Sequence, residues 1–558
     1  MKVSEYIVSR LVKDDVTDAF GVPGGVILKL LYAMEENSKI VPHLMTNEQS
    51  AGFAACGYAQ ASGKLGVAYA TRGPGITNMM TCIAEAYQES LPVIFITAHG
   101  KRTETKTRFE DNQELEIVNS VLNITKYAVS IDEIETVSYE IDKACKIALD
   151  ERKGPVLVDI LSSLYDKEIE KSEISDYTGI KKNEAVDCSS IIDKVKESIE
   201  EAKRPIILIG DGIRNLVSPN EMEKFSENLK IPIISSRGSQ DILMQSQYYY
   251  GYIGSHGTRY SNFILSKTDL IIVLGNRLAF PLKSESYAPV IEKVRMIRFD
   301  IDENEFTREI KNADNYKIDV KELIEYVVRN NIIIETHMDW IEVCDRLKEE
   351  LEEYDKPEPV KRLEKYFRNQ NSEKVYVVDV GNNEFFSSRA IEAAHPKGMM
   401  LCSKTYGTLG VALGRAIGAY YATKKEVICI MGDQGFQYNT QDLQYIARHK
   451  LPIDVVVLNN RSSGMIADHE HQLFGEKFVH VNENCDYFVP DLALISKAYG
   501  FCYRTDCDKN CEKQQFNILY EIKYPRDISL VPNLPKGNVC QNMEPLMEND
   551  KYTMLDQI

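Results

Sequence analysis

The segment Gly432-Asp433-Gln434-Gly435-Phe436-Gln437-Tyr438-Asn439 follows an apolar run at 427–431 that is typical of a buried strand. Farther along, a second apolar run at 453–458 leads to a pair of asparagines that ends with Asn460. Asp433 and Asn460 therefore follow the carboxyl ends of two predicted parallel strands, which is where open α/β sheets bind ligands. A carboxylate and an amide oxygen at this edge suit Mg²⁺ that holds a diphosphate.

Length and composition narrow the class of protein. A chain of 558 residues is too long for one hydrophobic core, and no apolar run approaches the ~18 residues of a membrane-spanning helix. The formal charge of −18 disfavours nucleic acid as a partner, because phosphate backbones bind basic surfaces. The twelve cysteines form no disulfide-like pattern, and the charged start of the chain does not resemble a signal peptide. We therefore expect a cytoplasmic protein without a membrane partner.

Strand-like runs alternate with helical patterns in three blocks of the chain. The runs lie at 18–21, 66–70, 91–97 and 156–160, then at 205–210, 231–235, 270–275 and 296–300, and finally from residue 375 onward. Such alternation predicts an α/β fold with three doubly wound parallel-sheet domains, at 1–165, 188–330 and 360–530. The remaining tail, 531–558, has little periodicity, and we expect it to pack over the active site or to be mobile.

The spacing of Gly-Asp and Asn-Asn resembles the signature of the thiamin-diphosphate enzymes. The order of the three blocks is similar to the pyrimidine-binding, middle and diphosphate-binding domains of the acetolactate synthase and pyruvate oxidase group. One residue departs from the pattern, because Gln434 stands where the third residue of the motif is normally Gly. The resemblance implies thiamin diphosphate and Mg²⁺ as cofactors, with Asp433, Asn460 and the carbonyl of Ser462 as metal ligands.

Glu48 is the candidate for the acid–base group. It stands at the start of a helical pattern rich in small residues, where the residues alone also allow a simple capping carboxylate. The surrounding motif resembles the one in which the family presents the glutamate that activates the cofactor through its pyrimidine N1′. Asn47 replaces the usual His of that motif, which leaves the carboxylate role intact.

The resemblance implies further contacts with the cofactor. A glycine-rich loop ending at Gly25 would approach its reactive carbon through backbone, as only glycines allow. The Gly-Pro-Gly turn that starts at Gly73, and Asn78 after it, are expected to contact the cofactor. The residues alone also allow an ordinary strand–helix turn at this point. Gly407 would bind the 4′-amino group through its carbonyl, and Leu409 would bend the cofactor into its V shape. The remaining expected cofactor contacts are Asn382, Asn383, Gly432, Gln434, Gly435, Gly464 and Met465.

Three residues bear on the substrates. Gln113 and Lys126 resemble the substrate-facing segment of acetolactate synthases, where a lysine would neutralise the carboxylate of a 2-oxo acid. For Lys126, a solvated position at the start of a strand is the alternative. His469 stands where those enzymes have a tryptophan that favours a second 2-oxo acid as acceptor, so a polar acceptor pocket and a different acceptor are expected.

The middle block resembles stretches that hold FAD in acetolactate synthases, where the flavin is largely structural. Here Gly210-Asp211-Gly212 replaces a Gly-Gly-Gly turn and brings an acid near the expected phosphates. FAD and an empty or nucleotide-binding middle domain therefore remain alternatives.

Together these features predict an enzyme that decarboxylates a 2-oxo acid, most simply pyruvate, and transfers the two-carbon unit to a carbonyl acceptor, such as a sugar-derived one. A decarboxylase that releases an aldehyde is the alternative enzyme. A non-catalytic nucleotide-binding relative is the alternative of another class, and the presence of Glu48, Asp433 and Asn460 together disfavours it. Since the glutamate and the metal motif lie on separate domains, which meet across a subunit interface in the family, a homodimer or homotetramer is expected.

Overall fold

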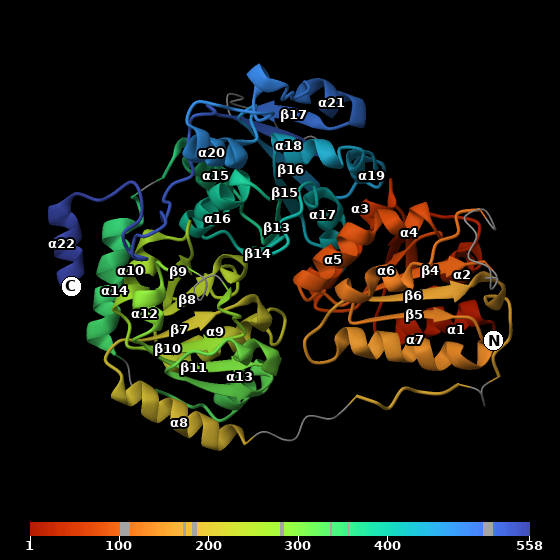
Figure 1. The fold of residues 1–558 in the computed structure, drawn as a ribbon, viewed down its shortest axis with the longest axis horizontal. Coiled ribbons are helices and arrows are strands. Elements are labelled where there is room, and N and C mark those ends of the chain that lie inside the picture. The colour runs from red at the N-terminus through yellow and green to blue at the C-terminus, as the bar shows by residue number, and fades with distance from the viewer. Residues whose placement is uncertain are drawn as a thin grey trace.

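The computed structural model describes residues 1–100, 112–170, 174–180, 187–279, 284–334, 337–354, 356–505 and 517–558. Within these residues the chain forms three six-stranded parallel sheets with helices between the strands (Figure 1). The predicted fold class, three doubly wound α/β domains, is confirmed. Each sheet lies inside one of the three segments that the sequence predicts as domains.

The first domain contains the sheet β2-β1-β3-β4-β6-β5. Its strands are β1 Asp18–Gly21, β2 Val41–Leu44, β3 Gly66–Tyr69, β4 Val93–His99, β5 Tyr127–Ile131 and β6 Val156–Leu161. Its helices are α1 Val3–Lys13, α2 Leu28–Glu35, α3 Glu48–Ser62, α4 Pro74–Asn78, α5 Met80–Gln88, α6 Val118–Val121 and α7 Ile134–Leu149, with the short 3₁₀ turns η1 Leu122–Ile124 and η2 Ser162–Leu164.

The middle domain contains the sheet β12-β11-β10-β7-β8-β9. Its strands are β7 Pro205–Ile209, β8 Ile233–Ser236, β9 Tyr249–Ile253, β10 Leu270–Leu274, β11 Arg295–Asp300 and β12 Ala313–Lys317. Its helices are α8 Cys188–Glu201, α9 Pro219–Leu229, α10 Arg259–Lys267, α12 Ala288–Ile291, α13 Val320–Arg329 and α14 Met338–Leu351, with the 3₁₀ turns η4 Asp211–Ile213, η5 Arg237–Ser239 and η6 Glu303–Thr307.

The third domain contains the sheet β14-β13-β15-β16-β18-β17. Its strands are β13 Lys374–Val378, β14 Gly398–Cys402, β15 Val427–Gly432, β16 Ile453–Asn459, β17 Cys502–Thr505 and β18 Ile518–Lys523. Its helices are α15 Glu358–Arg368, α16 Asn382–Ala394, α17 Ala412–Thr423, α18 Asp433–Tyr438, α19 Asp442–Arg448, α20 Gly464–Phe474 and α21 Leu492–Tyr499, with the 3₁₀ turn η7 Glu483–Cys485.

The central strands are buried along their whole length and are mostly apolar, because helices cover both faces of each sheet. Every residue of β4, β7, β10 and β13 is buried. Such continuous apolar runs are the pattern that made these strands predictable from the sequence.

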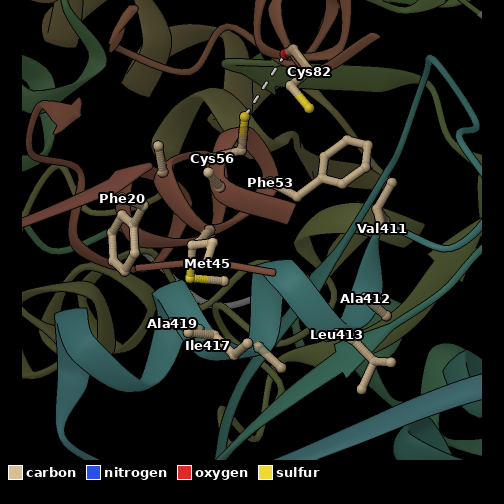
Figure 2. Close-up of a cluster of buried hydrophobic side chains, with 14 of the residues drawn as sticks. Phe20, Met45, Phe53, Cys56, Cys82, Val411, Ala412, Leu413, Ile417 and Ala419 are labelled. Carbon is tan, nitrogen blue, oxygen red and sulfur yellow. Dashed lines mark hydrogen bonds between the residues drawn. The ribbon is translucent and has the colours of Figure 1, made fainter. Parts of the chain in front are cut away.

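The first and third domains pack together through α3 and α17. Both helices are rich in small residues, and side chains of both domains share one buried cluster (Figure 2). The helices approach so closely that a Cβ on Gly57 would clash with the backbone of Arg415, and one on Gly418 with the backbone of Ala54. The helix rich in small residues that begins at Glu48 therefore packs tightly, and its partner is α17.

The C-terminal tail, for which the sequence predicts packing over the active site or mobility, packs on the middle domain. The tail ends in helix α22, Asn549–Gln557, which lies beside α10 and α14 (Figure 1). Arg259 of α10 donates hydrogen bonds to the carbonyls of Met543 and Pro545, at 2.8 and 2.9 Å. Leu555 and Met547 join the buried cluster of the middle domain. Among the described helices, none has the length and apolar character needed to cross a bilayer.

Candidate active site

Each sheet has a topological switch point, where the strand order reverses and a crevice opens at the carboxyl edge. The switch lies between β13 and β15 in the third domain, between β1 and β3 in the first, and between β7 and β10 in the middle domain. Asp433 follows β15, while the turns that contain Gly25 and Gly73 follow β1 and β3. These predicted site residues therefore lie at two of the three crevices.

Asp433 is the first residue of α18 and is almost completely buried. Its Oδ1 accepts a hydrogen bond of 2.9 Å from the hydroxyl of Tyr487. Its Oδ2 is buried and has no hydrogen-bond partner among the described residues. Burial raises the pKa of this carboxyl to about 6. A buried carboxylate oxygen without a partner is costly unless a cation binds it.

Asn460 and Ser462 follow β16, the strand next to β15, in the register Gly432 opposite Leu458. Both side chains are buried, and Oδ1 of Asn460 accepts the backbone N–H of Ser462 at 3.2 Å. Gln434, which departs from the family motif, accepts a hydrogen bond of 2.9 Å from the hydroxyl of Ser463. Its side chain therefore joins the two halves of the motif.

Asn382 and Asn383 begin α16 beside this motif and are both buried. Oδ1 of Asn382 also lacks a partner among the described residues, while its Nδ2 lies 3.3 Å from Oδ2 of Asp468. Asn383 donates to the carbonyl of Asp379 at 2.9 Å. A Cβ on Gly464 would lie only 3.0 Å from the side-chain nitrogens of Asn382 and Asn460. The missing side chain of Gly464 thus leaves room beside these two buried amides at the start of α20, where Met465 is exposed.

These residues fit Mg²⁺ with a diphosphate. The cation prefers oxygen ligands and shares its coordination sphere with phosphate oxygens. The structure offers the unpartnered carboxylate oxygen of Asp433, the amide oxygen of Asn460 and the carbonyl of Ser462 at one crevice. The unpartnered oxygen of Asn382 adds a second buried group that lacks a partner.

The loop at 403–411 carries Gly407 and Leu409 and is fixed at its end by a buried carboxylate. Asp379, which follows β13, accepts the N–H groups of Gly410 and Val411 at 3.0 and 3.1 Å. A Cβ on Gly435 would clash with the same carboxylate. Burial raises the pKa of Asp379 to about 7. Asp379 therefore connects the loop of Leu409 with the start of α18.

Glu48 opens helix α3, as the sequence predicts, and Asn47 caps this helix by accepting the N–H of Ser50 at 2.8 Å. Oε2 of Glu48 accepts a hydrogen bond of 2.9 Å from Nδ2 of Asn78, at the end of α4. Oε1 lies 3.5 Å from the position of a Cβ on Gly75. The structure thus brings Glu48 together with the Gly-Pro-Gly turn.

Gly25, Gly73 and Gln113 surround the same crevice. Gly25 is exposed and a Cβ there would meet open space, whereas the preceding Gly24 packs closely on Thr71. Gly73, with φ of +63°, lies beside Gln113, whose carbonyl would be 2.5 Å from a Cβ on this glycine. The side chain of Gln113 is exposed at this point.

Lys126 does not join this group. Its ammonium donates to the carbonyls of Ile147 and Asp150, at 2.6 and 2.7 Å, which are the last carbonyls of α7 and its cap. Burial lowers the pKa of Lys126. The residue precedes β5 and so lies at the amino end of a strand, away from the crevice. The expected contact with a substrate carboxylate is therefore corrected, and Lys126 caps a helix.

The first and third domains meet close to these residues, but Glu48 itself bonds within the first domain. Ser50 donates to Asp442 at 2.7 Å, Thr46 also bonds Asp442, and Asn439 donates to Gln49 at 3.3 Å. Among the described residues, no hydrogen bond or ion pair joins Glu48 to Asp433 or Asn460. His469 is exposed on α20, one residue after Asp468.

A cavity of about 680 Å³ lies at the switch point of the middle sheet and is lined by residues of all three domains, including Gln60, Arg152, Arg214, Arg237, Arg277 and Lys404. The turn Gly210-Asp211-Gly212 does not fit a flavin diphosphate. Its N–H groups at 210, 212, 213 and 214 all donate to backbone carbonyls. The carboxylate of Asp211 pairs with Lys404 and, at 2.7 Å, with Arg214. The turn therefore offers a diphosphate a negative charge and few free donors.

Three residues of the site carry little signal in the sequence. Tyr487 reaches Asp433 from a segment without regular structure, and Asp468 lies within a helix at no motif position. Of these three, only Asp379 carries a signal, because it is an acidic residue near the carboxyl end of the predicted strand that starts at residue 375.

Family models of the thiamine pyrophosphate enzymes match three parts of the chain. The N-terminal TPP binding domain matches residues 1–120, the central domain residues 192–327, and the C-terminal TPP binding domain residues 379–518. The chain is similar to the acetolactate synthase large subunit of Cyanidium caldarium, with 30% identity over 88% of this chain and 87% of the relative. It is also similar to the acetolactate synthase isozyme 2 large subunit of Escherichia coli (strain K12), with 28% identity over 90% of each chain. A third relative is the probable acetolactate synthase large subunit of Methanococcus aeolicus, with 30% identity over 100% of this chain and 98% of the relative.

Proposed function

Because this chain belongs to the thiamine pyrophosphate enzymes, in their acetolactate synthase-like group, we propose that it decarboxylates a 2-oxo acid, most simply pyruvate, and transfers the two-carbon unit to a carbonyl acceptor. The observation that carries this proposal is the pair of buried, unpartnered oxygens on Asp433 and Asn382 at the third-domain crevice. Buried oxygens of this kind are expected where a bound ion or ligand completes the hydrogen bonding.

In this proposal Mg²⁺ is bound by Asp433, Asn460 and the carbonyl of Ser462, and Asn382 and Asn383 contact the diphosphate. When bound, thiamin diphosphate supplies the electron sink that decarboxylation of a 2-oxo acid requires. Gly407 and Leu409 lie on a loop that Asp379 fixes, which suits residues that must hold the pyrimidine half in one conformation.

In this proposal, the carboxyl group of Glu48 shares a proton with the pyrimidine nitrogen N1′. Asn78 fixes its Oε2, so Oε1 is the oxygen left to share a proton with the ring. General acid–base groups of this kind depend on orientation as well as on pKa, and the capped start of α3 provides a fixed position. Gly25 and Gln113 surround the same crevice and are assigned to the substrate side.

The acceptor in this proposal presents hydroxyl groups where a second 2-oxo acid would present a short alkyl chain. His469 is exposed on α20, beside the cofactor residues Gly464 and Met465. An imidazole offers hydrogen bonds, which suit a hydroxylated or sugar-derived carbonyl compound.

The active unit is proposed to be a homodimer or homotetramer. The part of the third domain around α20 and α21 exposes many large apolar side chains, and α20 buries none of its own residues. The apolar side chains that are at least half exposed there are Ile466, Leu473, Phe474, Val479, Phe488 and Leu494. Exposed large apolar side chains in this number are typical of a protein interface. A second copy that places its Glu48 over these side chains would complete the site.

Product analysis tests the proposal. The purified protein is incubated with pyruvate, thiamin diphosphate and Mg²⁺, with and without a panel of aldehyde and ketone acceptors. We expect CO₂ and a carbon–carbon-linked product in equal amounts. Aldehyde as the sole organic product would identify a simple decarboxylase instead, and the absence of CO₂ release with any 2-oxo acid would contradict the proposal.

A further inference from the structure

The loop at 403–411 is held at its start by a carboxylate from another domain. Oε1 of Glu89, which follows α5 in the first domain, accepts the backbone N–H groups of Lys404, Thr405 and Tyr406 at 2.9, 2.6 and 3.3 Å. The next residue, Gly407, donates its N–H to the hydroxyl of Ser403 at 3.0 Å. One oxygen atom of the first domain therefore receives three successive N–H groups of the third.

The carboxylate of Glu89 is buried, so these hydrogen bonds replace its contact with water. Hydrogen bonds to an ionised acceptor are stronger than those between neutral groups. The ammonium of Lys404 lies 3.7 Å from Oε2 of Glu89 and also pairs with Asp211 of the middle domain. Lys404 therefore balances the charge of Glu89 and ties the start of this loop to all three domains.

The other end of the loop is fixed by Asp379, through the N–H groups of Gly410 and Val411. Only Gly407, Thr408 and Leu409 lie between the two carboxylate anchors. Gly407 has φ of +73°, and a Cβ on it would meet no atom within 4 Å, so its backbone borders open space. The two residues assigned to the pyrimidine half of the cofactor thus stand between two fixed points.

We propose that Glu89 is a positioning residue for thiamin diphosphate, because it sets the backbone of 404–406 from which Gly407 and Leu409 reach the cofactor. This inference rests on the proposed function, since it needs the cofactor at this loop. Glu89 acts through the loop and does not touch the reacting atoms. Asp211 contributes to the same effect through Lys404.

The test compares Glu89→Ala, Glu89→Gln and Glu89→Asp in the full-length protein. The amide oxygen of Gln can still accept the three N–H groups, whereas Asp keeps the charge but is shorter by one methylene. The matched control is Asp142→Ala, since Asp142 is a buried carboxylate of the same domain that bonds Arg10, Lys146 and the N–H of Tyr177. Two quantities are measured: hydrogen exchange of the amides at 404–406, and the Kd for thiamin diphosphate with Mg²⁺.

Glu89→Ala is expected to increase exchange at 404–406 and to raise the Kd about tenfold or more, roughly the effect of losing charge-assisted hydrogen bonds that hold a binding loop. Glu89→Gln should restore most of the affinity, and Glu89→Asp should bind weakly despite its charge. Asp142→Ala should lower the melting temperature yet leave the Kd and the exchange at 404–406 unchanged.

Unchanged affinity in a folded Glu89→Ala or Glu89→Asp protein would overturn the proposal, as would unchanged exchange at 404–406. If Glu89→Ala does not fold, the contrast between Gln and Asp decides, and equal affinities in these two variants would overturn it. If the proposed function itself is wrong, the results will differ from these. The unmodified protein would then bind no thiamin diphosphate, while substitution of Glu89 would still change hydrogen exchange at 404–406.

Discussion

Nδ2 of Asn78 donates a hydrogen bond of 2.9 Å to Oε2 of Glu48. The two residues come from different elements of the first domain, since Glu48 begins α3 and Asn78 ends α4. Helix α3 packs on β1 and β3, the strands on either side of the switch point, and α4 follows β3. The hydrogen bond therefore fixes the rotation of a carboxyl group at a crevice where ligands bind, and it leaves the second oxygen for chemistry.

Replacement of Glu48 by Gln should preserve the fold and cofactor affinity but abolish most turnover. An amide cannot share a proton with the pyrimidine nitrogen, and loss of one acid–base group typically costs roughly 10²–10⁴-fold in rate. Steady-state turnover with pyruvate measures this effect. The control is Glu116→Gln, which changes an exposed carboxylate of the same domain. A loss of turnover of less than about threefold, far smaller than this usual loss, would refute the role of Glu48.

Asp442 should make stability depend on pH. Burial raises the pKa of this carboxyl from 3.8 to about 6, although it accepts hydrogen bonds from Thr46 and Ser50. The folded state then holds the proton more tightly than the unfolded state, so this group makes folding less favourable as the pH rises from about 4 to about 6.

Asp442→Asn removes this titration, and the hydroxyls of its two partners can turn to suit an amide. Denaturant unfolding across this pH range should therefore show a flatter dependence of the free energy of unfolding in the variant. Parallel curves for the two proteins would show that Asp442 does not titrate in this way.

Much of this site was predictable because its residues follow strands. Asp433 and Asn460 come directly after apolar runs, and the carboxyl ends of parallel strands meet at one edge of a sheet. The same rule explains the error with Lys126, which stands before a strand and so lies at the amino edge. Tyr487 could not be found, because its contact with Asp433 depends on how a segment without periodicity folds back over α18.

The exposed apolar side chains of the third domain predict that the protein is an oligomer. Light scattering should show at least twice the mass of one chain. Phe488→Glu, which puts a charge on a side chain that is 70% exposed, should reduce the assembly to monomers and abolish turnover. Met338→Glu, at an apolar side chain on α14 that is 55% exposed, is the control and should change neither property. A monomer that retains full activity would contradict the shared site.

Acceptor choice should depend on His469. Tryptophan offers a flat apolar wall, whereas imidazole offers hydrogen bonds, and a polar site rejects compounds that leave its groups unpaired. We expect poor use of 2-oxobutanoate and better use of a hydroxylated carbonyl acceptor, with His469→Trp shifting the preference toward the apolar acid. Competition assays with pairs of acceptors measure this, and strong selection of 2-oxobutanoate over pyruvate by the unmodified enzyme would count against a polar acceptor site.

The most direct test of the account is a calorimetric titration of thiamin diphosphate into chelator-treated protein, with and without added Mg²⁺. Because Asp433 has a buried oxygen without a partner at the crevice, the cation should bridge this residue and the diphosphate. We expect tight binding by the unmodified protein only when Mg²⁺ is present, and loss of that dependence in Asp433→Ala. Equal affinity in the two proteins, or binding that does not respond to Mg²⁺, would contradict it.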